Sequence, residues 1–147
     1  MIANDDYEEI APNFKSALIK KAPSVHPFWG LLGMQLKDVK KGWAVVRLAF
    51  DPKLTQGDGI AHGGAIFSAA DASVAMALIG MLARSETLVT LEMKINYLKP
   101  FSSGAILAEA HIAHKGSRTC LGEVSVMTET GELIAKALAT YMIIPKK

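Results

Sequence analysis

One short segment of the sequence combines groups that can stabilise negative charge on a ligand. Gly63 and Gly64 follow His62 and come directly before an apolar segment that is typical of a helix. The first N–H groups of a helix have no intrahelical acceptor, and a helix N-terminus favours negative charge. Because glycine also allows a ligand to approach the backbone closely, the segment predicts an oxyanion hole for the carbonyl oxygen of a substrate.

An acidic residue follows within the same helical segment. Asp71 is the only charged residue between Gly64 and Ala83. A carboxylate in such apolar surroundings is a candidate general base or nucleophile. The alternative is a structural one, in which the glycines make a tight helix entry and Asp71 is a buried group that is hydrogen-bonded to backbone. The residues alone leave both interpretations open.

The spacing of the two features constrains any active site. Gly63 and Asp71 are eight residues apart, which is about 12 Å along a helix. An oxyanion donor and a base or nucleophile must both lie within about 3 Å of one reacting group. One chain cannot satisfy this, whereas two antiparallel helices related by a two-fold axis can. If this is an active site, two subunits share it.

The hydrophobic pattern predicts an α+β chain with a mainly antiparallel sheet. A short helix is expected after Pro12, at 15–21, and residues 22–27 are expected to break it into a loop. The long helix is expected from Gly64 to Ala83. Strands are expected at 34–40, 43–50, 89–97, 106–112, 120–128 and 133–144. In the third of these, strict alternation puts Val89, Leu91 and Met93 on the apolar face and Thr90 on the polar face.

The long helix is apolar on nearly every side, so it needs cover all round. A sheet that curls around it, together with a second copy of the chain on the remaining face, provides that cover. A membrane span is the alternative, but the central Asp71 and the lack of a basic flank make it a poor one. We therefore expect a homo-oligomer and no membrane.

Composition narrows the function classes. The 147 residues carry a net charge of +2, which is too small for a protein that binds a nucleic-acid backbone. The single cysteine cannot form an internal disulfide or a thiolate metal site, and we expect neither a metal nor a cofactor. The first nine residues contain no basic and apolar export signal, so a cytoplasmic location is expected.

The segment from His62 to Ala72 resembles the signature of hotdog-fold acyl-CoA thioesterases of the phenylacetate-degradation type, and Leu91 to Pro100 resembles the strand after the helix in that family. The resemblance covers Gly33 to the C-terminus. It implies a hotdog fold, a curved antiparallel sheet wrapped around one long central helix. The implied organisation is an N-terminal helix and loop at residues 1–32 and a hotdog domain at residues 33–147.

The resemblance also implies roles for individual residues. Asp71 matches the nucleophile or the general base for water, and the backbone N–H of Gly63 matches the donor to the thioester oxygen. His62 lies where related enzymes support that contact. Gln56 matches a position whose amide orients the thioester or the water. Thr90 falls where some members position the water, although its expected polar face makes access to the site less direct.

Other positions leave the substrate open. Gln at position 56 is shared with aryl-CoA thioesterases whose helix carboxylate is Glu, and Ala75 lacks the hydroxyl that those enzymes have. The phosphates of coenzyme A are candidate ligands of Lys115, Ser117 and Arg118, for which a solvated turn is the alternative. Three aromatic residues are candidates for an acyl pocket or, alternatively, for the core: Phe28, Trp29 and Phe67.

The expected function is hydrolysis of an acyl-CoA or acyl-carrier-protein thioester to a free acid and a thiol. Asp71 of one chain would act with the Gly63 N–H of the partner subunit. A dimer is the smallest unit that contains this site, and the expected assembly is a homotetramer. The alternative is a hotdog protein that binds acyl-CoA without catalysis, because a fold does not determine a function.

Overall fold

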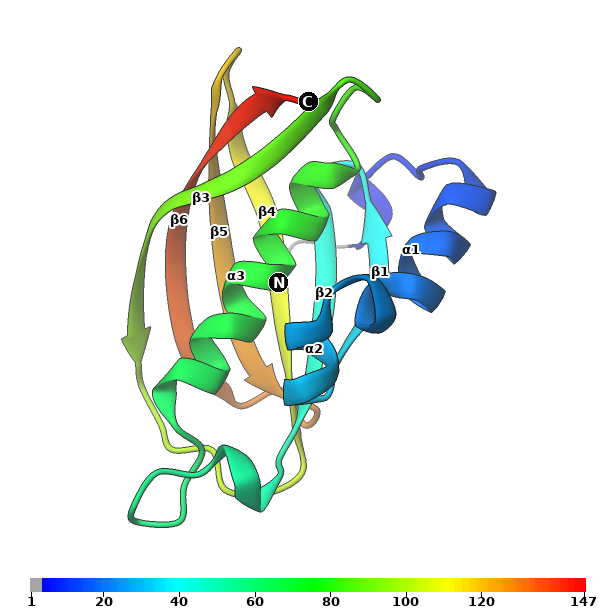
Figure 1. The fold of residues 1–147 in the computed structure, drawn as a ribbon. Helices are drawn as coiled ribbons and strands as arrows, with labels where there is room; N and C mark the ends of the chain where they lie inside the picture. Colours follow the sequence, from blue (N-terminus) through cyan, green and yellow to red (C-terminus); the bar gives the residue numbers. More distant parts are fainter. Residues whose placement is uncertain (1–3) are drawn as a thin grey trace.

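The computed structural model describes residues 4–147. A six-stranded antiparallel sheet curves around one central helix, α3 (Gly63–Ile79), as Figure 1 shows. The strand order is β1-β2-β4-β5-β6-β3, and every neighbouring pair is antiparallel. The expected α+β hotdog architecture is confirmed. The strands are β1 (Met34–Lys40), β2 (Trp43–Ala49), β3 (Glu86–Tyr97), β4 (Ala105–Lys115), β5 (Thr119–Thr128) and β6 (Leu133–Pro145).

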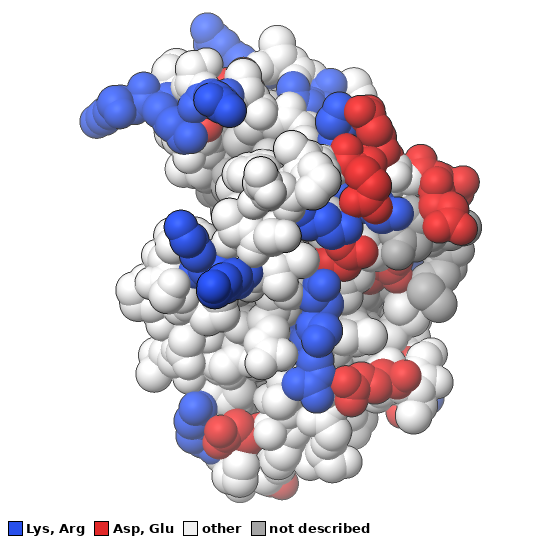
Figure 2. Space-filling view, turned by 90° about the vertical axis from the view of Figure 1, so that its right-hand side faces the viewer, with Lys and Arg blue, Asp and Glu red and all other residues white. Residues whose placement is uncertain are grey.

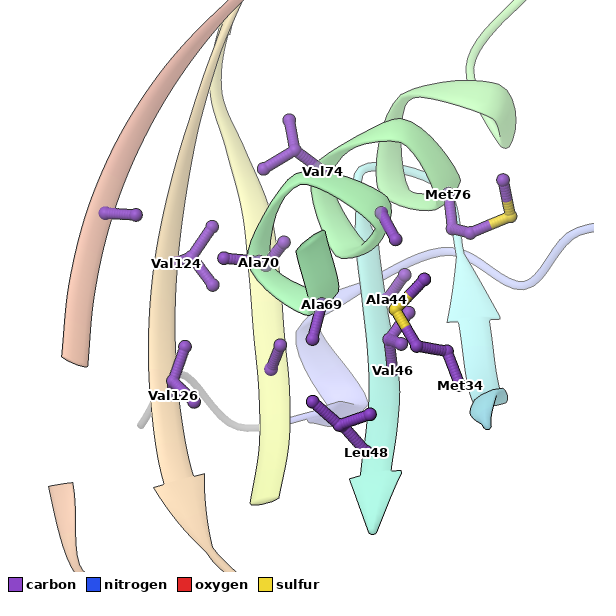
Figure 3. Close-up of a cluster of buried hydrophobic side chains, with 14 of the residues drawn as sticks. Met34, Ala44, Val46, Leu48, Ala69, Ala70, Val74, Met76, Val124 and Val126 are labelled. Atoms are coloured by element: carbon purple, nitrogen blue, oxygen red, sulfur yellow. The ribbon is translucent and has the colours of Figure 1, made fainter. Parts of the chain in front are cut away.

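Small residues let α3 lie close to the sheet. Ala69 and Ala70 are fully buried on the helix, and Val74 points toward β5 (Figure 3). At Gly122 of β5, a Cβ atom would lie 2.5 Å from Cγ1 of Val74. Any residue other than glycine there would force the side chain of Val74 or its surroundings to shift. The core between helix and sheet also includes Met34, Ala44, Val46, Leu48, Met76, Val124 and Val126.

The N-terminal region is more helical than the sequence predicts. A short 3₁₀ turn (Asn4–Asp6) precedes α1 (Pro12–Val25), and α2 (Pro27–Leu32) follows directly. The expected loop at residues 22–27 is therefore wrong. Pro23 lies in the last turn of α1, where its missing N–H costs one hydrogen bond and little of the helix remains to be interrupted. Pro27 occupies the first turn of α2, where proline is well tolerated. Residues 1–3 lie outside the described part of the chain.

Ion pairs hold the segment before α1 against the first strand. Lys15 Nζ lies 2.9 Å from Glu9 and 2.6 Å from Asp38 of β1, and Lys41 Nζ lies 2.6 Å from Glu8. Figure 2 shows this side of the molecule, where positive and negative side chains are interspersed. The N-terminal segment thus covers the β1 edge of the sheet, while β3 forms the opposite edge.

Strand β3 does not alternate regularly. Thr90 pairs with Tyr141 and Glu92 with Thr140, so Leu91 is an extra residue in a β-bulge. The bulge reverses the order of the faces: Thr90 points toward α3, whereas Val89 and Leu91 are 43% and 52% exposed. The expectation that Thr90 lies on the outer, polar face is wrong for this reason.

The helices of residues 4–147 include none that is long and apolar enough to cross a membrane. The apolar segment that suggested a span is divided, because α3 ends at Ile79 and a turn follows. Its apolar sides are covered by the sheet instead.

Candidate active site

Two hydroxyl groups hold the carboxylate of Asp71. Thr90 Oγ1 lies 2.9 Å from Asp71 Oδ1, and the Tyr141 hydroxyl lies 2.5 Å from the same oxygen. Thr90 and Tyr141 are cross-strand partners on β3 and β6, so the sheet presents both hydroxyls side by side to the helix. The carboxylate is therefore fixed in orientation by two donors to one oxygen.

The other carboxylate oxygen is open. Asp71 Oδ2 has no hydrogen-bond or ion-pair partner within residues 4–147. Asp71 itself is half-buried on a helix whose neighbouring residues are mostly buried. An ionised carboxylate only accepts hydrogen bonds, so an open Oδ2 is free to accept a proton from water or to attack a carbonyl carbon.

Tyr141 is a functional candidate that the sequence analysis missed. Its side chain is 1% exposed, and its hydroxyl also lies 2.7 Å from the main-chain oxygen of Asp71. Burial, together with the charge of Asp71 and the hydrogen bond to it, holds the pKa of Tyr141 far above its ordinary value. The hydroxyl therefore stays protonated as a donor. The only sequence pattern that indicates it is its place on the inward face of β6, after Ala135, Ala137 and Ala139.

The start of α3 presents an open backbone donor. The N–H of Gly63 has no acceptor in the described part of the chain, whereas the N–H of Gly64 donates to His62 Nδ1 at 2.9 Å. The Tyr97 hydroxyl donates to the carbonyl of Gly63 at 2.7 Å, and a Cβ at Gly63 would lie 3.0 Å from that ring. His62 and Tyr97 thus hold the first turn from two sides and leave the Gly63 N–H available.

The loop before α3 places Gln56 away from Asp71 of its own chain. The main chain of Gln56 pairs with Ile60 (2.9 Å) and Gly59 (3.1 Å), which closes a tight turn. Its side-chain oxygen accepts the N–H of Asp58, and Nε2 lies 3.4 Å from Asp58 Oδ2. Gln56 therefore belongs structurally to the Gly63 end of the site, since both lie on the same short segment.

The candidate phosphate-binding residues lie at one end of the sheet. Lys115, Ser117 and Arg118 are exposed around the β4–β5 turn. Ser117 and Arg118 line a groove of about 590 Å³ together with Glu86 and the last residues of β6. Lys115 does not line it. The structure thus brings two of these three residues together at a surface hollow.

Within one chain, the two halves of the site do not meet. Gly63 and Asp71 lie on the same helix, eight residues apart, and thus about 12 Å apart along its axis. Thr90 and Tyr141 contact Asp71, whereas Tyr97 contacts the carbonyl of Gly63 and His62 contacts the N–H of Gly64. No group of three or more His, Cys, Asp or Glu residues in positions 4–147 is arranged to hold a metal ion.

Comparisons with known proteins identify the family of this chain. The family model of the thioesterase superfamily matches residues 58–135. A 1,4-dihydroxy-2-naphthoyl-CoA hydrolase of Listeria monocytogenes is 28% identical over 116 residues, which cover 79% of this chain and 94% of that protein. A solved structure of a conserved protein from Pseudomonas aeruginosa is 31% identical, with a TM-score of 0.76 and coverage of 80% of this chain and 93% of that chain.

A further solved structure shows the same fold at lower identity. The E. coli PaaI protein, from the phenylacetic acid degradation operon, is 22% identical with a TM-score of 0.79 and coverage of 91% of this chain and 96% of that chain. The matched family segment includes Gly63, Asp71 and Thr90 and spans more than half of the chain. The chain therefore belongs to the thioesterase superfamily and is a thioesterase with the hotdog fold.

Proposed function

We propose that this thioesterase hydrolyses an acyl-CoA thioester to a free acid and coenzyme A, at a site that two copies of the chain share. The observation that carries the proposal is the Asp71 carboxylate, which is held through Oδ1 by Thr90 and Tyr141 and is open at Oδ2. The similarity to a hydrolase of a CoA thioester supports coenzyme A as the thiol.

The chemistry has two routes from this geometry. In the first, Asp71 Oδ2 accepts a proton from water while the water oxygen attacks the thioester carbon. In the second, Oδ2 attacks that carbon itself, the thiolate leaves, and water then hydrolyses the mixed anhydride. In both, the carbonyl oxygen becomes an oxyanion that an N–H at a helix start stabilises. The thiolate takes up a proton as coenzyme A leaves.

The free edge of β3 supports a shared site. No strand within residues 4–147 pairs with this edge, and β3 carries the exposed apolar residues Val89 and Leu91. An open apolar edge of this kind is a template for pairing with another strand. Antiparallel pairing of two copies along β3 would bring the two α3 helices together in opposite directions. Gly63 of the partner subunit would then lie opposite Asp71.

The same arrangement assigns the remaining candidates. Gln56 and His62 would move with Gly63, because they lie in the segment that leads into α3. They would act on the thioester from the partner's side. We further propose that Lys115, Ser117 and Arg118 contact the phosphates of coenzyme A.

A pair of substitutions at Gly63 tests the oxyanion donor. Gly63→Pro removes the N–H, and proline suits this first helical position, since His62 already has an extended backbone (φ −61°, ψ 136°). Gly63→Ala is the matched control, because it adds a Cβ against the same Tyr97 ring and keeps the N–H. We expect Gly63→Pro to lose about 100-fold or more in kcat and Gly63→Ala to lose much less.

Mixed oligomers test whether the site is shared. Asp71→Asn and Gly63→Pro should each be inactive alone. When the two chains assemble together, each mixed dimer has one site with both changes and one intact site, so random mixing restores about a quarter of the sites. Absence of any recovery in verified mixed dimers would contradict the shared site. Thiol release from acyl-CoAs that is unaffected by Asp71→Asn would contradict the proposed chemistry.

Isotope labelling separates the two routes. Label in the Asp71 side chain after a single turnover in ¹⁸O-water, detected by mass spectrometry of the peptide, identifies the nucleophilic route with attack of water on the Asp71 carboxyl carbon. Label in the product acid arises from the base route and also from attack of water on the acyl carbon of the anhydride, so trapping of the acyl-enzyme with hydroxylamine separates these two cases.

A further inference from the structure

A groove of about 460 Å³ lies between the end of α3 and the start of β3. Its first lining residue on α3, Ile79, lies about two helical turns beyond Asp71. Ile79 and Leu82 line it from the helix side, and Leu88 lines it from the strand. Its far wall comes from the N-terminal segment, through Ile10 and Phe14. This segment precedes the part of the chain that matches the thioesterase family model.

The groove continues the line of residues that begins at Asp71. Along α3, each step of four residues rises about 6 Å, which leads from Asp71 through Ala75 to Ile79. Along β3, each step of two residues advances about 6.7 Å on the same face, which leads from Thr90 to Leu88. Because Thr90 is hydrogen-bonded to Asp71, the two series advance together from the carboxylate into the groove.

The walls of the groove suit a hydrocarbon chain. Ile79 and Leu88, the lining residues that come first after Asp71 on α3 and after Thr90 on β3, are aliphatic. The lining also includes charged residues: Lys41, Arg84, Glu86 and Lys146. A thioester held at Asp71 extends in two directions, an acyl chain and a pantetheine arm. The pantetheine amides would lose water against aliphatic side chains, which is unfavourable without new hydrogen bonds. An alkyl chain gains from the same burial, by roughly fourfold in affinity for each methylene.

The far wall is fixed in place. The main-chain N–H of Lys41 donates to Glu8 at 2.9 Å, and Lys15 bridges Glu9 and Asp38. Ile10 is 6% exposed and sits close to Gly80, where a Cβ would lie 3.3 Å from Cγ2 of Ile10. A wall that is held this way limits the length of a chain in the groove. The aromatic candidates Phe28, Trp29 and Phe67 do not line it.

We propose that this groove binds a linear aliphatic acyl chain of the substrate and that the N-terminal segment around Ile10 and Phe14 sets the longest chain that fits. The inference rests on the proposed thioester hydrolysis for the position of the reacting carbon. It adds a substrate class, the medium-length aliphatic acyl thioesters.

Two substitutions test the proposal by changing the groove. Leu88→Phe fills it next to the site, and Leu138→Phe is the matched control, because Leu138 is exposed on the outer face of β6. The assay measures kcat/KM for acetyl-, butanoyl-, octanoyl- and palmitoyl-CoA. We expect Leu88→Phe to lower the octanoyl value by about tenfold or more and the acetyl value by about twofold or less. Phe14→Ala, which opens the far wall, should shift the preference toward longer chains.

Binding measurements keep this test separate from catalysis. Calorimetric titration of the Asp71→Asn variant with the same acyl-CoAs should show affinity that rises with chain length, and Leu88→Phe should remove that rise. A rise that persists in a folded Leu88→Phe variant would overturn the inference. If Leu88→Phe instead lost the same affinity for acetyl-CoA and octanoyl-CoA, and Arg84→Ala bound free coenzyme A more weakly, the groove would bind the pantetheine arm. If no acyl-CoA is hydrolysed, the proposed function is wrong. The dependence of affinity on chain length still shows whether the groove binds the acyl chain.

Discussion

Replacing Tyr141 with Phe removes one of the two hydroxyls that hold Asp71 and leaves the ring in place. The lost oxygen lies 2.5 Å from Asp71 Oδ1, and its side chain is 1% exposed, so bulk water does not reach the vacated position. Thr90 remains as the single donor, at 2.9 Å. The carboxylate then has one fixed contact instead of two, and Oδ2 is held less firmly toward the substrate.

The size of the effect follows from this contact. A hydrogen bond to a charged group contributes about 1.5–3 kcal/mol, which corresponds to about 10- to 100-fold in rate if it is fully realised in the transition state. We expect kcat to fall within this range. KM should change little, because the hydroxyl of Tyr141 contacts Asp71 and not the substrate. The free energy of unfolding should fall by about 1–2 kcal/mol.

The assay is steady-state thiol release, with thermal unfolding measured on the same preparations. Thr90→Val removes the other hydroxyl at similar shape and should have a comparable effect, and Thr90→Ser should restore most of the activity. Because both hydroxyls donate to the same oxygen, the loss of kcat in the double variant should differ from the combined losses of the two single variants. A folded Tyr141→Phe enzyme with kcat within about twofold of wild type would refute the role of this hydroxyl.

Three further predictions follow from other features of the structure. The raised pKa of Tyr141 means that the folded state holds this proton more tightly than the unfolded chain. Its contribution is therefore complete below the unfolded pKa of about 10 and is lost above it, by up to about 1.4 kcal/mol per pH unit. In urea unfolding between about pH 9 and pH 11, the free energy of unfolding should fall more steeply in wild type than in Tyr141→Phe, which keeps the raised pKa values of Tyr7, Tyr97 and Cys120. Parallel curves would contradict this. Gly122→Ala should destabilise the protein by about 1–3 kcal/mol, because the new Cβ meets Val74 at 2.5 Å. Denaturant unfolding checks this, with Gly57→Ala, where nothing lies within 4 Å, as the control. Leu91→Lys should place a charge on the free β3 edge, give monomers in sedimentation velocity and abolish hydrolysis; an active monomer would contradict the shared site.

The order of elements was predictable because each has a clear period and boundary. The long helix begins at the glycine pair, and the later strands have enough alternation to be recognised, although β-bulges interrupt it. The N-terminal region was harder, since Pro23 and Pro27 mark helix breaks in most sequences. Here they occupy the last turn of one helix and the first turn of the next, where proline costs little. Packing of α1 and α2 against β1 favours two consecutive helices over a loop. The local sequence does not contain that information.

The sequence alone indicates only part of the candidate site. The helix rise separates Gly63 from Asp71, and the structure places both on α3; a site shared with a second copy stays a prediction. Tyr141 was not identified, because its role depends on register: β6 lies beside β3 and sets its hydroxyl level with Thr90. Tyr97 was missed for the same reason, since its hydroxyl reaches Gly63 only when the strand runs past the helix start.

The bulge in β3 also has a consequence for insertions and deletions. Thr90 and Tyr97 are seven residues apart, and an odd separation in an unbroken strand would point them to opposite faces. Leu91 corrects this parity by one residue, so that both point toward α3. Loss of Leu91 itself would leave a regular strand with both residues still facing the helix. Loss of any single residue from Glu92 to Asn96 also leaves an even separation of six between Thr90 and Tyr97, so a strand that loses the bulge keeps both residues facing the helix. A one-residue deletion between these two positions is therefore compensated by removal of the bulge.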